Sequence, residues 1–212
     1  MSVVALDIGS SRIKAVLADW DGRIVDIRSA KTPVVAAVAG EHAFPADAVL
    51  AAAEAHIAGL ADSHQLDAID TVVFSCLGTA MVPVDRSERP LGPALSPADT
   101  RPPMGAALEA DLGLPMDRLR HLTGSDPRIA SFLGHFVWWR QAHPEVIDRL
   151  HRFRSLRGFI VQRLCGADAE DQTWASRTML MDLATNAWSE AILSAAKLPT
   201  EVLPEILPST TA

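Results

Sequence analysis

Eight residues near the start of the chain bring a carboxylate, small side chains and an ammonium group together, in the order Asp7-Ile8-Gly9-Ser10-Ser11-Arg12-Ile13-Lys14. The apolar runs that flank Gly9-Ser10-Ser11 predict a β-hairpin with a tight turn. Consecutive backbone N–H groups in such a turn can form a concavity that binds anions. Gly9 lets the backbone approach a ligand, because it has no side chain, and Ser10, Ser11 and Lys14 add hydroxyl and ammonium donors. Asp7 is placed to hold Mg²⁺ directly or through water, since Mg²⁺ prefers carboxylates and retained waters.

An ordinary structural role explains the same segment. Aspartate and serine are common in hairpin turns because their side chains bond nearby backbone groups. Short motifs of this kind discriminate weakly when they stand alone. The segment therefore predicts either a phosphate-binding turn or a plain hairpin, and its context has to favour one of them.

Composition limits the class of protein. The chain has 212 residues, 49% of them hydrophobic, and a formal net charge of −7. This length suffices for one large or two small domains with a real core, while the acidic balance disfavours non-specific nucleic-acid binding. The sequence shows neither an apolar run near the ~20 residues of a membrane span nor the basic start of a secretory signal. The two cysteines, Cys76 and Cys165, are interpreted as reduced thiols, and we expect a cytoplasmic protein with no membrane or nucleic-acid partner.

Residues 1–85 follow the pattern of a mixed α/β layer. We expect strands at residues 3–6, 13–17 and 23–28, a helix from 45 to 60, and strands at 69–76 and 81–84. The run 69–76 is almost entirely apolar, which is typical of a strand buried on both faces. After the helix, this strand has to lie parallel to the first one. Such an order begins a ribonuclease-H-like layer, which actin-like ATPases and sugar kinases share.

The rest of the chain has a helical pattern after a proline-rich loop at residues 89–103. We expect helices at residues 104–112, 130–142, 144–153, 155–164, 173–181 and 189–197. Trp138 and Trp139 are adjacent and cannot share one helix face, so we expect one in the core and the other over a groove or interface. Asp171 or Thr173 is expected to cap a helix start. Four arginines are expected on a solvated face or against an acidic partner: Arg149, Arg152, Arg154 and Arg157.

A series of motifs resembles the N-terminal half of the FGGY family of carbohydrate kinases. The segments are Val72-Val73-Phe74-Ser75, Pro83-Val84-Asp85, Arg89-Pro90-Leu91, Ala98-Asp99-Thr100-Arg101, Trp138 to Glu145, Leu164-Cys165-Gly166, Asp171 with Ala175-Ser176 and Thr178, Leu180 with Asp182, Trp188-Ser189, and Leu203-Pro204-Glu205. No single motif is decisive, but their order is specific, and this context favours the phosphate-binding reading of the hairpin. The resemblance implies a ribonuclease-H-like α/β fold of the actin-like ATPase and sugar kinase superfamily, with a mixed sheet and helical additions.

The resemblance also implies one domain organisation. Residues 1–212 form the family's N-terminal domain, with the sheet core at about 1–85, loop and helical additions at about 86–200, and the start of a linker at 201–212. Family members are roughly twice as long, and their second half supplies most of the adenosine site. We therefore expect a missing C-terminal domain, or self-association through an exposed apolar face that would otherwise meet it.

The implied activity is transfer of the γ-phosphate of ATP to a hydroxyl of a small sugar or polyol, with Mg²⁺. The hairpin residues Gly9, Ser10, Ser11 and Lys14 would contact phosphates and Asp7 the metal. The implied substrate residues are Gly78, Thr79, Asp99 and Arg101. The family's general base, an aspartate, is expected beyond Ala212, so no catalytic residue is expected in this chain and no turnover from it alone.

Several departures from the family pattern support a rival hypothesis. Gly78-Thr79 replaces a larger pair such as Met-His, Pro97 replaces a tryptophan, and His135 stands where the family often has lysine. These changes fit a non-catalytic relic that binds a ligand or a partner chain. Asp99 and Arg101 can also simply pair with each other or cap a turn. An actin-like ATPase domain is a third class, which the helix-rich second half disfavours.

Overall fold

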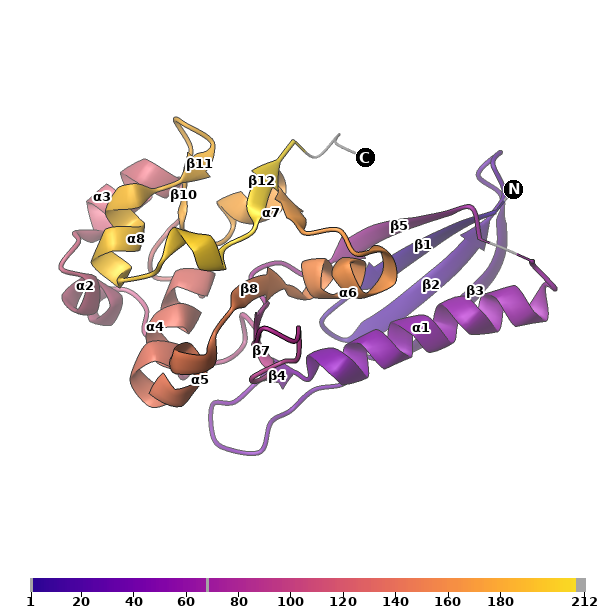
Figure 1. The fold of residues 1–212 in the computed structure, drawn as a ribbon, viewed down its shortest axis with the longest axis horizontal. Coiled ribbons are helices and arrows are strands. Elements are labelled where there is room, and N and C mark those ends of the chain that lie inside the picture. Colours follow the sequence, from indigo (N-terminus) through magenta and orange to yellow (C-terminus); the bar gives the residue numbers. More distant parts are fainter. Residues whose placement is uncertain (1, 68, 209–212) are drawn as a thin grey trace. The chain divides into compact units, whose positions relative to one another are not determined.

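The computed structural model describes residues 2–67 and 69–208 and divides them into two compact units (Figure 1). The first unit comprises Met1–Val34 and Phe44–Leu77. The second comprises Val35–Ala43 and Gly78–Ala212. The fold is mixed α/β, as the sequence predicts.

The first unit is a four-stranded mixed sheet with one long helix, α1 (Ala46–Ser63). Its strands are β1 (Val3–Ile8), β2 (Arg12–Ala18), β3 (Ile24–Lys31) and β5 (Thr71–Cys76), in the spatial order β3-β2-β1-β5. The first three strands are antiparallel, and β5 lies parallel to β1 with Leu6 opposite Phe74. The predicted order of strands and helix, and the parallel pairing, are confirmed.

Alternation along β1 and β2 gives the sheet one buried face. Val4, Leu6 and Ile8 are at most 1% exposed, and their partners on β2 are Leu17, Ala15 and Ile13. Helix α1 packs against β2 and β3. Burial of these side chains is the main stabilising term for the unit, at roughly 25 cal/mol for each Å² of apolar surface removed from water.

The prediction that the strand at 69–76 is buried on both faces is wrong. In the described part of the chain β5 pairs only with β1, and the face of the sheet that carries Val73 is exposed. Val73 is 47% exposed and Ser75 is also exposed. Val73 pairs with Ala5, Ala5 with Val16, and Val16 with Ile27, which is 54% exposed. This apolar row crosses the sheet on the face opposite the buried one.

The second unit is built around a single apolar helix, α4 (Phe132–Ala142), capped by the Ser131 hydroxyl, which accepts a hydrogen bond from the Gly134 N–H. Phe132 and Phe136 pack edge-on against Phe153, with ring centroids 5.0 and 5.9 Å apart. The other helices are α2 (Ala106–Leu112), α3 (Met116–Thr123), α5 (Pro144–Arg149), α6 (Leu156–Cys165), α7 (Gln172–Ser176), α8 (Glu190–Ala196) and the 3₁₀ turn η1 (Thr200–Val202).

Short strands complete this unit. They are β4 (Ala43–Phe44, shared with the first unit), β6 (Met81–Val84), β7 (Ala94–Leu95), β8 (Arg152–Ser155), β9 (Ala169–Asp171), β10 (Met181–Asp182), β11 (Ala187–Trp188) and β12 (Glu205–Leu207). Strand β6 pairs antiparallel with β8, and β12 pairs parallel with β9. Residues 205–207, expected to begin a linker, are therefore held in a strand; residues 209–212 lie outside the described part.

Two predicted helices are shorter than expected. The segment 144–153 is helical only to Arg149, because the chain then extends into β8 to pair with β6. The segment 173–181 is helical only to Ser176, since Met179 takes a left-handed φ of 63° that no α-helix accommodates. The predicted strand at 81–84 is confirmed as β6, whereas the sequence analysis missed α3 and the other short strands of this unit.

The structure also confirms the expectations for the cysteines, the cap of the helix near residue 173 and the two adjacent tryptophans. Neither Cys76 nor Cys165 takes part in a disulfide. Asp171 caps α7 by accepting a hydrogen bond from the Trp174 N–H at 2.9 Å. Trp139 is 4% exposed, whereas Trp138 is only half-buried. Within residues 2–67 and 69–208, every helix is too short or too polar to span a bilayer.

Candidate functional site

The hairpin between β1 and β2 is closed by its glycine. The Gly9 N–H donates to the Arg12 carbonyl at 3.0 Å, which leaves Ser10-Ser11 as a two-residue loop. A Cβ at position 9 would lie 3.0 Å from that same carbonyl oxygen. Gly9 is therefore required by the hairpin itself, and its N–H is not free to bind a phosphate. Its role in closing the hairpin therefore explains why glycine stands at position 9 without any bound ligand.

Thr32, which directly follows β3, supports the loop through two hydrogen bonds. The Thr32 N–H donates to the Ser11 carbonyl at 3.1 Å, and the Thr32 hydroxyl donates to the Gly9 carbonyl at 2.7 Å. Ser10 and Ser11 are exposed, and within the described residues their hydroxyls form no hydrogen bond. The loop is thus held by its carbonyls and presents two unpaired hydroxyls to solvent. Sequence reasoning missed Thr32, whose only signal is its place just after the third strand.

Asp7 and Lys14 face each other across the β1–β2 pair. Their register is direct, and the Lys14 Nζ lies 3.7 Å from the Asp7 carboxylate. Both side chains are about half exposed, at 46% for Asp7 and 50% for Lys14. An ion pair of this exposure stabilises the fold by less than about 1 kcal/mol. The pair therefore leaves a carboxylate and an ammonium group accessible beside the two serines.

Asp7 is a single carboxylate and not part of a closed metal cage. In the described part of the chain, no three His, Cys, Asp or Glu side chains gather closely enough to hold a metal ion. Mg²⁺ usually keeps several waters and takes one or two carboxylates together with substrate phosphates. The chemistry of Asp7 fits that mode, in which most ligands are not supplied by protein.

Gly78 and Thr79 follow β5 and form a strained turn. Thr79 has a φ of 65°, a left-handed conformation that is uncommon for a β-branched residue. Its hydroxyl donates to the Gly78 carbonyl at 2.7 Å, and the residue is 4% exposed. A Cβ at Gly78 would meet nothing within 4 Å. The turn therefore combines backbone strain at Thr79 with open space at Gly78. Strain of this kind is concentrated at functional sites.

Asp99 and Arg101 pair with each other, as the structural alternative predicts. The Arg101 guanidinium donates to the Asp99 carboxylate at 3.0 and 2.7 Å. The Asp99 side chain is fully buried, and it also accepts from the N–H groups of Arg101 and His42, each at 3.1 Å. Burial acts to raise the pKa of Asp99, but the hydrogen bonds from Arg101 and His42 outweigh it and hold the pKa below its usual value.

Arg101 is held on its other sides as well. Its guanidinium lies 4.4 Å from the centroid of the Trp138 ring, in a cation–π contact, and donates to Glu41 at 3.2 Å. Hydrogen bonds to Asp99 raise the pKa of Arg101 still further, so the side chain is always charged. These partners neutralise the only cation among the four predicted substrate residues.

His135 completes this group from inside α4. The residue is 2% exposed, and its ring interacts with the Thr79 backbone. Burial lowers the pKa of His135 to about 4, against smaller opposing effects of the Asp99 carboxylate and the Thr79 backbone. The ring is therefore neutral at pH 7 and lies close to both segments. Asp99 and the Thr79 backbone both act on its pKa, and the sequence analysis could relate these two segments only through the family resemblance.

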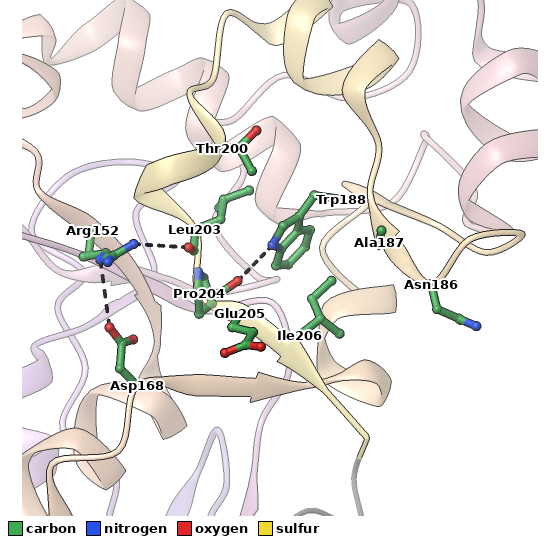
Figure 2. A pocket seen from close by; sticks show the side chains of 10 residues that line it. All are labelled: Arg152, Asp168, Asn186, Ala187, Trp188, Thr200, Leu203, Pro204, Glu205 and Ile206. Atoms are coloured by element: carbon green, nitrogen blue, oxygen red, sulfur yellow. Dashed lines mark hydrogen bonds and ion pairs between the residues drawn. The ribbon is translucent and has the colours of Figure 1, made fainter.

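The second unit carries cavities of different size, two of which are defined by their lining residues. The smaller, about 270 Å³, is lined in part by Arg101, Trp138 and Glu41. The larger, about 540 Å³, is shown in Figure 2. The Trp188 Nε1–H in its wall donates to the Pro204 carbonyl at 2.9 Å. None of the predicted site residues lines this larger cavity, whereas Arg101 lines the smaller one.

The predicted site residues thus form two groups. Asp7, Gly9, Ser10, Ser11 and Lys14 are all on the hairpin of the first unit. Gly78, Thr79, Asp99 and Arg101 are all in the second unit. The first group offers exposed donors and a carboxylate, and the second comprises an open turn and a neutralised ion pair.

Comparison with known proteins agrees with this architecture. The family model for the N-terminal domain of the FGGY carbohydrate kinases matches residues 2–212. A xylulose kinase of Lactococcus lactis subsp. lactis is 26% identical over 98% of this chain and 42% of its own length. An L-fuculokinase of Escherichia coli K12 is 24% identical over 97% of this chain and 44% of its own length.

Solved structures show the same fold. The crystal structure of a gluconate kinase from Lactobacillus acidophilus superposes with a TM-score of 0.87 at 20% identity, covering 99% of this chain and 42% of that one. The chain thus spans less than half the length of the relatives it matches. Its match to the family model over residues 2–212 shows that the chain belongs to the FGGY family of carbohydrate kinases, as an N-terminal domain.

Proposed function

We propose that this chain is the sugar-binding half of an ATP-dependent kinase that transfers a phosphoryl group to a hydroxyl of a sugar or polyol. The observation that carries the proposal is the β1–β2 hairpin of a confirmed family member, which presents two unpaired serine hydroxyls beside the Asp7–Lys14 pair. A phosphoryl-transfer site needs donors and a metal ligand to neutralise charge on the moving group. This hairpin supplies both kinds of group.

Each hairpin residue has a distinct role in the proposal. Ser10 and Ser11 donate hydrogen bonds to phosphate oxygens, and Lys14 adds a positive charge. Asp7 would hold Mg²⁺ directly or through water, and the ion would neutralise charge on the transferred phosphate. Gly9 does not bind phosphate through its N–H, which the hairpin uses, and acts by fixing the loop. Thr32 positions the same loop through its bonds to Ser11 and Gly9.

The second group of residues would orient the acceptor. A hydroxyl has to be held in line with the phosphoryl group for transfer to be fast. We propose that the open turn at Gly78–Thr79 receives the sugar. Asp99 and Arg101 would fix their own loop, because the Arg101 guanidinium donates two hydrogen bonds to the Asp99 carboxylate.

The general base and the adenosine-binding groups are proposed to come from outside these 212 residues. Relatives are more than twice as long as the part this chain matches. We therefore expect binding without turnover from the chain alone. Sugar-dependent release of ADP by the purified chain would contradict this expectation.

The rival proposal is a non-catalytic relic that binds a ligand or partner chain. One observation favours it: Asp99 and Arg101 satisfy each other and leave little polar capacity for a substrate. The two proposals differ at the hairpin, since a relic has no need of nucleotide phosphates. Self-association through the exposed apolar row of the sheet also stays a prediction, which sedimentation of the purified chain tests.

Titration of the chain with MgADP and MgATP, followed by calorimetry and amide NMR, tests the kinase proposal. We expect amide shifts at Ser10 and Ser11. Because hydrogen bonds to charged groups contribute about 1.5–3 kcal/mol each, the double variant Ser10→Ala/Ser11→Ala should bind at least tenfold more weakly. Ser194→Ala, on the exposed surface of α8, is the matched control and should bind normally. Equal affinity of all three proteins would favour the relic.

A further inference from the structure

The face of the four-stranded sheet that carries Val73 and Ile27, here called the open face, is exposed within the described residues. Val73, Ile27 and Ile24 on this face are 47, 54 and 59% exposed. Cross-strand pairing aligns its side chains in two rows that are apolar except for one threonine, namely Val73-Ala5-Val16-Ile27 and Thr71-Val3-Ala18-Ile24. Contiguous exposed apolar side chains of this kind mark interaction sites on soluble proteins.

A third row, at the hairpin end of the open face, is polar. It consists of Ser75, Asp7, Lys14 and Ser29. The two charges lie on the two central strands, with Asp7 on β1 and Lys14 on β2, and both side chains are about half exposed. The open face therefore combines two apolar rows with one pair of opposite charges.

A two-fold axis parallel to the strands, between β1 and β2, makes the open face complementary to itself. The strand order β3-β2-β1-β5 places two strands on each side of such an axis. Rotation sets β1 of one copy over β2 of the other, and β5 over β3, at the same level along the strands. Val73 then meets Ile27 of the second copy. In the polar row, Asp7 of each copy meets Lys14 of the other.

The arrangement of the charges favours a second copy of this chain as the occupant. A partner has to bring a cation to Asp7 and an anion to Lys14, about 5 Å apart on neighbouring strands, and apolar side chains to the other two rows. The same face turned by the two-fold rotation supplies all of these, as an isologous interface requires.

The size of the open face indicates a weak, reversible contact. Four strands of about six residues cover about 20 by 19 Å, so two copies would bury about 800 Å² in total. This area lies at the low end for specific interfaces. We therefore expect a dissociation constant between about 1 µM and 1 mM.

We propose that two copies of this chain associate through the open face, and that this association excludes phosphate from the β1–β2 hairpin. The exclusion follows because Asp7 and Lys14 bridge the copies in the dimer, whereas in the monomer they are free for Mg²⁺ and phosphate. A ligand that binds only the monomer shifts the equilibrium towards it by mass action. The inference rests on the proposed phosphoryl-transfer role of these residues and goes beyond it by coupling that role to assembly.

Two charge variants test the symmetry of the contact by sedimentation velocity at low ionic strength, where exposed charges are screened least. Asp7→Lys and Lys14→Asp should each weaken self-association at least about tenfold, because like charges then face each other across the axis. An equimolar mixture should associate again, since each introduced charge meets its opposite, and mixing does not repair a folding defect. Asp117→Lys, at an exposed carboxylate of α3, is the control and should associate normally. A mixture as monomeric as its components overturns the inference.

An uncharged double variant tests the coupling to phosphate. Ile27→Gln/Val73→Gln should be monomeric where the wild-type chain is dimeric, and Val34→Gln/Val38→Gln, at exposed valines outside the sheet, should associate normally. MgADP should convert the wild-type dimer into monomers, and it should bind the monomeric variant more tightly than it binds the dimeric wild type.

The outcomes separate the inference from the proposed function. A wild-type chain that stays monomeric up to about 1 mM overturns the inference and leaves the open face to a segment outside these 212 residues. MgADP shifts at Ser10 and Ser11 in a dimer that persists also overturn it, while the phosphate-binding role of the hairpin stands. Absence of MgADP binding by the monomeric variant overturns both.

Discussion

Replacing His135 with phenylalanine should remove a pH-dependent loss of stability from this chain. The pKa of the ring falls from 6.5 in the unfolded reference to about 4 in the folded protein, because burial disfavours the charged imidazole. Between these values the unfolded chain binds more protons than the folded one. The stabilising effect of neutral His135 is therefore complete above about pH 6.5 and is lost as the pH falls towards 4.

The size of the effect follows from the two pKa values. At about pH 5.5 the folded ring stays neutral, while the unfolded ring is about ten-elevenths protonated. Protonation of the unfolded state then lowers the free energy of unfolding by about 1.4 kcal/mol relative to about pH 8. This amount should separate the pH dependence of the wild-type chain from that of His135→Phe. At about pH 8 the variant should be at least as stable, since it no longer buries the polar nitrogens of the ring.

Urea unfolding followed by tryptophan fluorescence measures this difference. Four of the five tryptophans, Trp138, Trp139, Trp174 and Trp188, are in the unit that contains His135, so the signal reports on that unit. His121→Phe, an exposed histidine on α3, is the control and should keep the wild-type pH dependence. Identical pH dependence in wild type and His135→Phe would refute the reasoning, because the ring would then have to be solvated or paired in the folded chain.

Two further substitutions test the packing of the same unit. Asp99→Ala leaves Arg101 without its closest partner and should lower the free energy of unfolding by about 3 kcal/mol. The control Asp117→Ala removes a 96% exposed carboxylate and should lower it by less than about 0.5 kcal/mol. Equal urea midpoints for these two variants would contradict the buried pair. Gly92→Ala places a Cβ where it would overlap the Trp139 indole, so it should lower the free energy of unfolding by about 1–3 kcal/mol. A lower melting temperature measures this loss, and an unchanged melting temperature would show that the ring moves freely.

The sheet unit was predictable because local signals and topology agree there. Alternating apolar residues in β1 and β2 and the helical pattern at residues 45–60 each predict an element, and only a parallel β5 satisfies the connection. The exposure of β5 was not predictable. An apolar run has the same composition whether one face or both faces of its sheet are covered, so the residue type of Val73 does not show that its face is exposed.

Errors in the second unit have a common physical cause. Strand β8 forms because Arg152–Ser155 pairs with β6, about 70 positions earlier in the chain, and such pairing leaves no local pattern. The same pairing explains why Arg154 is 6% exposed and bonded to Glu88 and Asp168, where the sequence predicted a solvated or partner-facing arginine run. Long-range partners override local preference at these positions.

In the candidate site, too, local features were predictable and long-range contacts were not. The hairpin donors were predictable from residue types and spacing, since the loop is local. The use of the Gly9 N–H within the hairpin and the support from Thr32 required coordinates. His135 was visible in the sequence only as a departure from a family pattern. Its burial and the effect of Asp99 and Thr79 on its pKa arise from packing around α4, which spacing alone does not reveal.

Amide NMR mapping of D-xylulose on the ¹⁵N-labelled chain tests the central claim most directly, namely that this domain binds a sugar at the turn after β5. The account predicts saturable shifts at Gly78 and Thr79 and on α4 around His135, with the amides near Trp188 unchanged. Shifts confined to the cavity lined by Trp188 and Arg152, or no shifts at all, would contradict it.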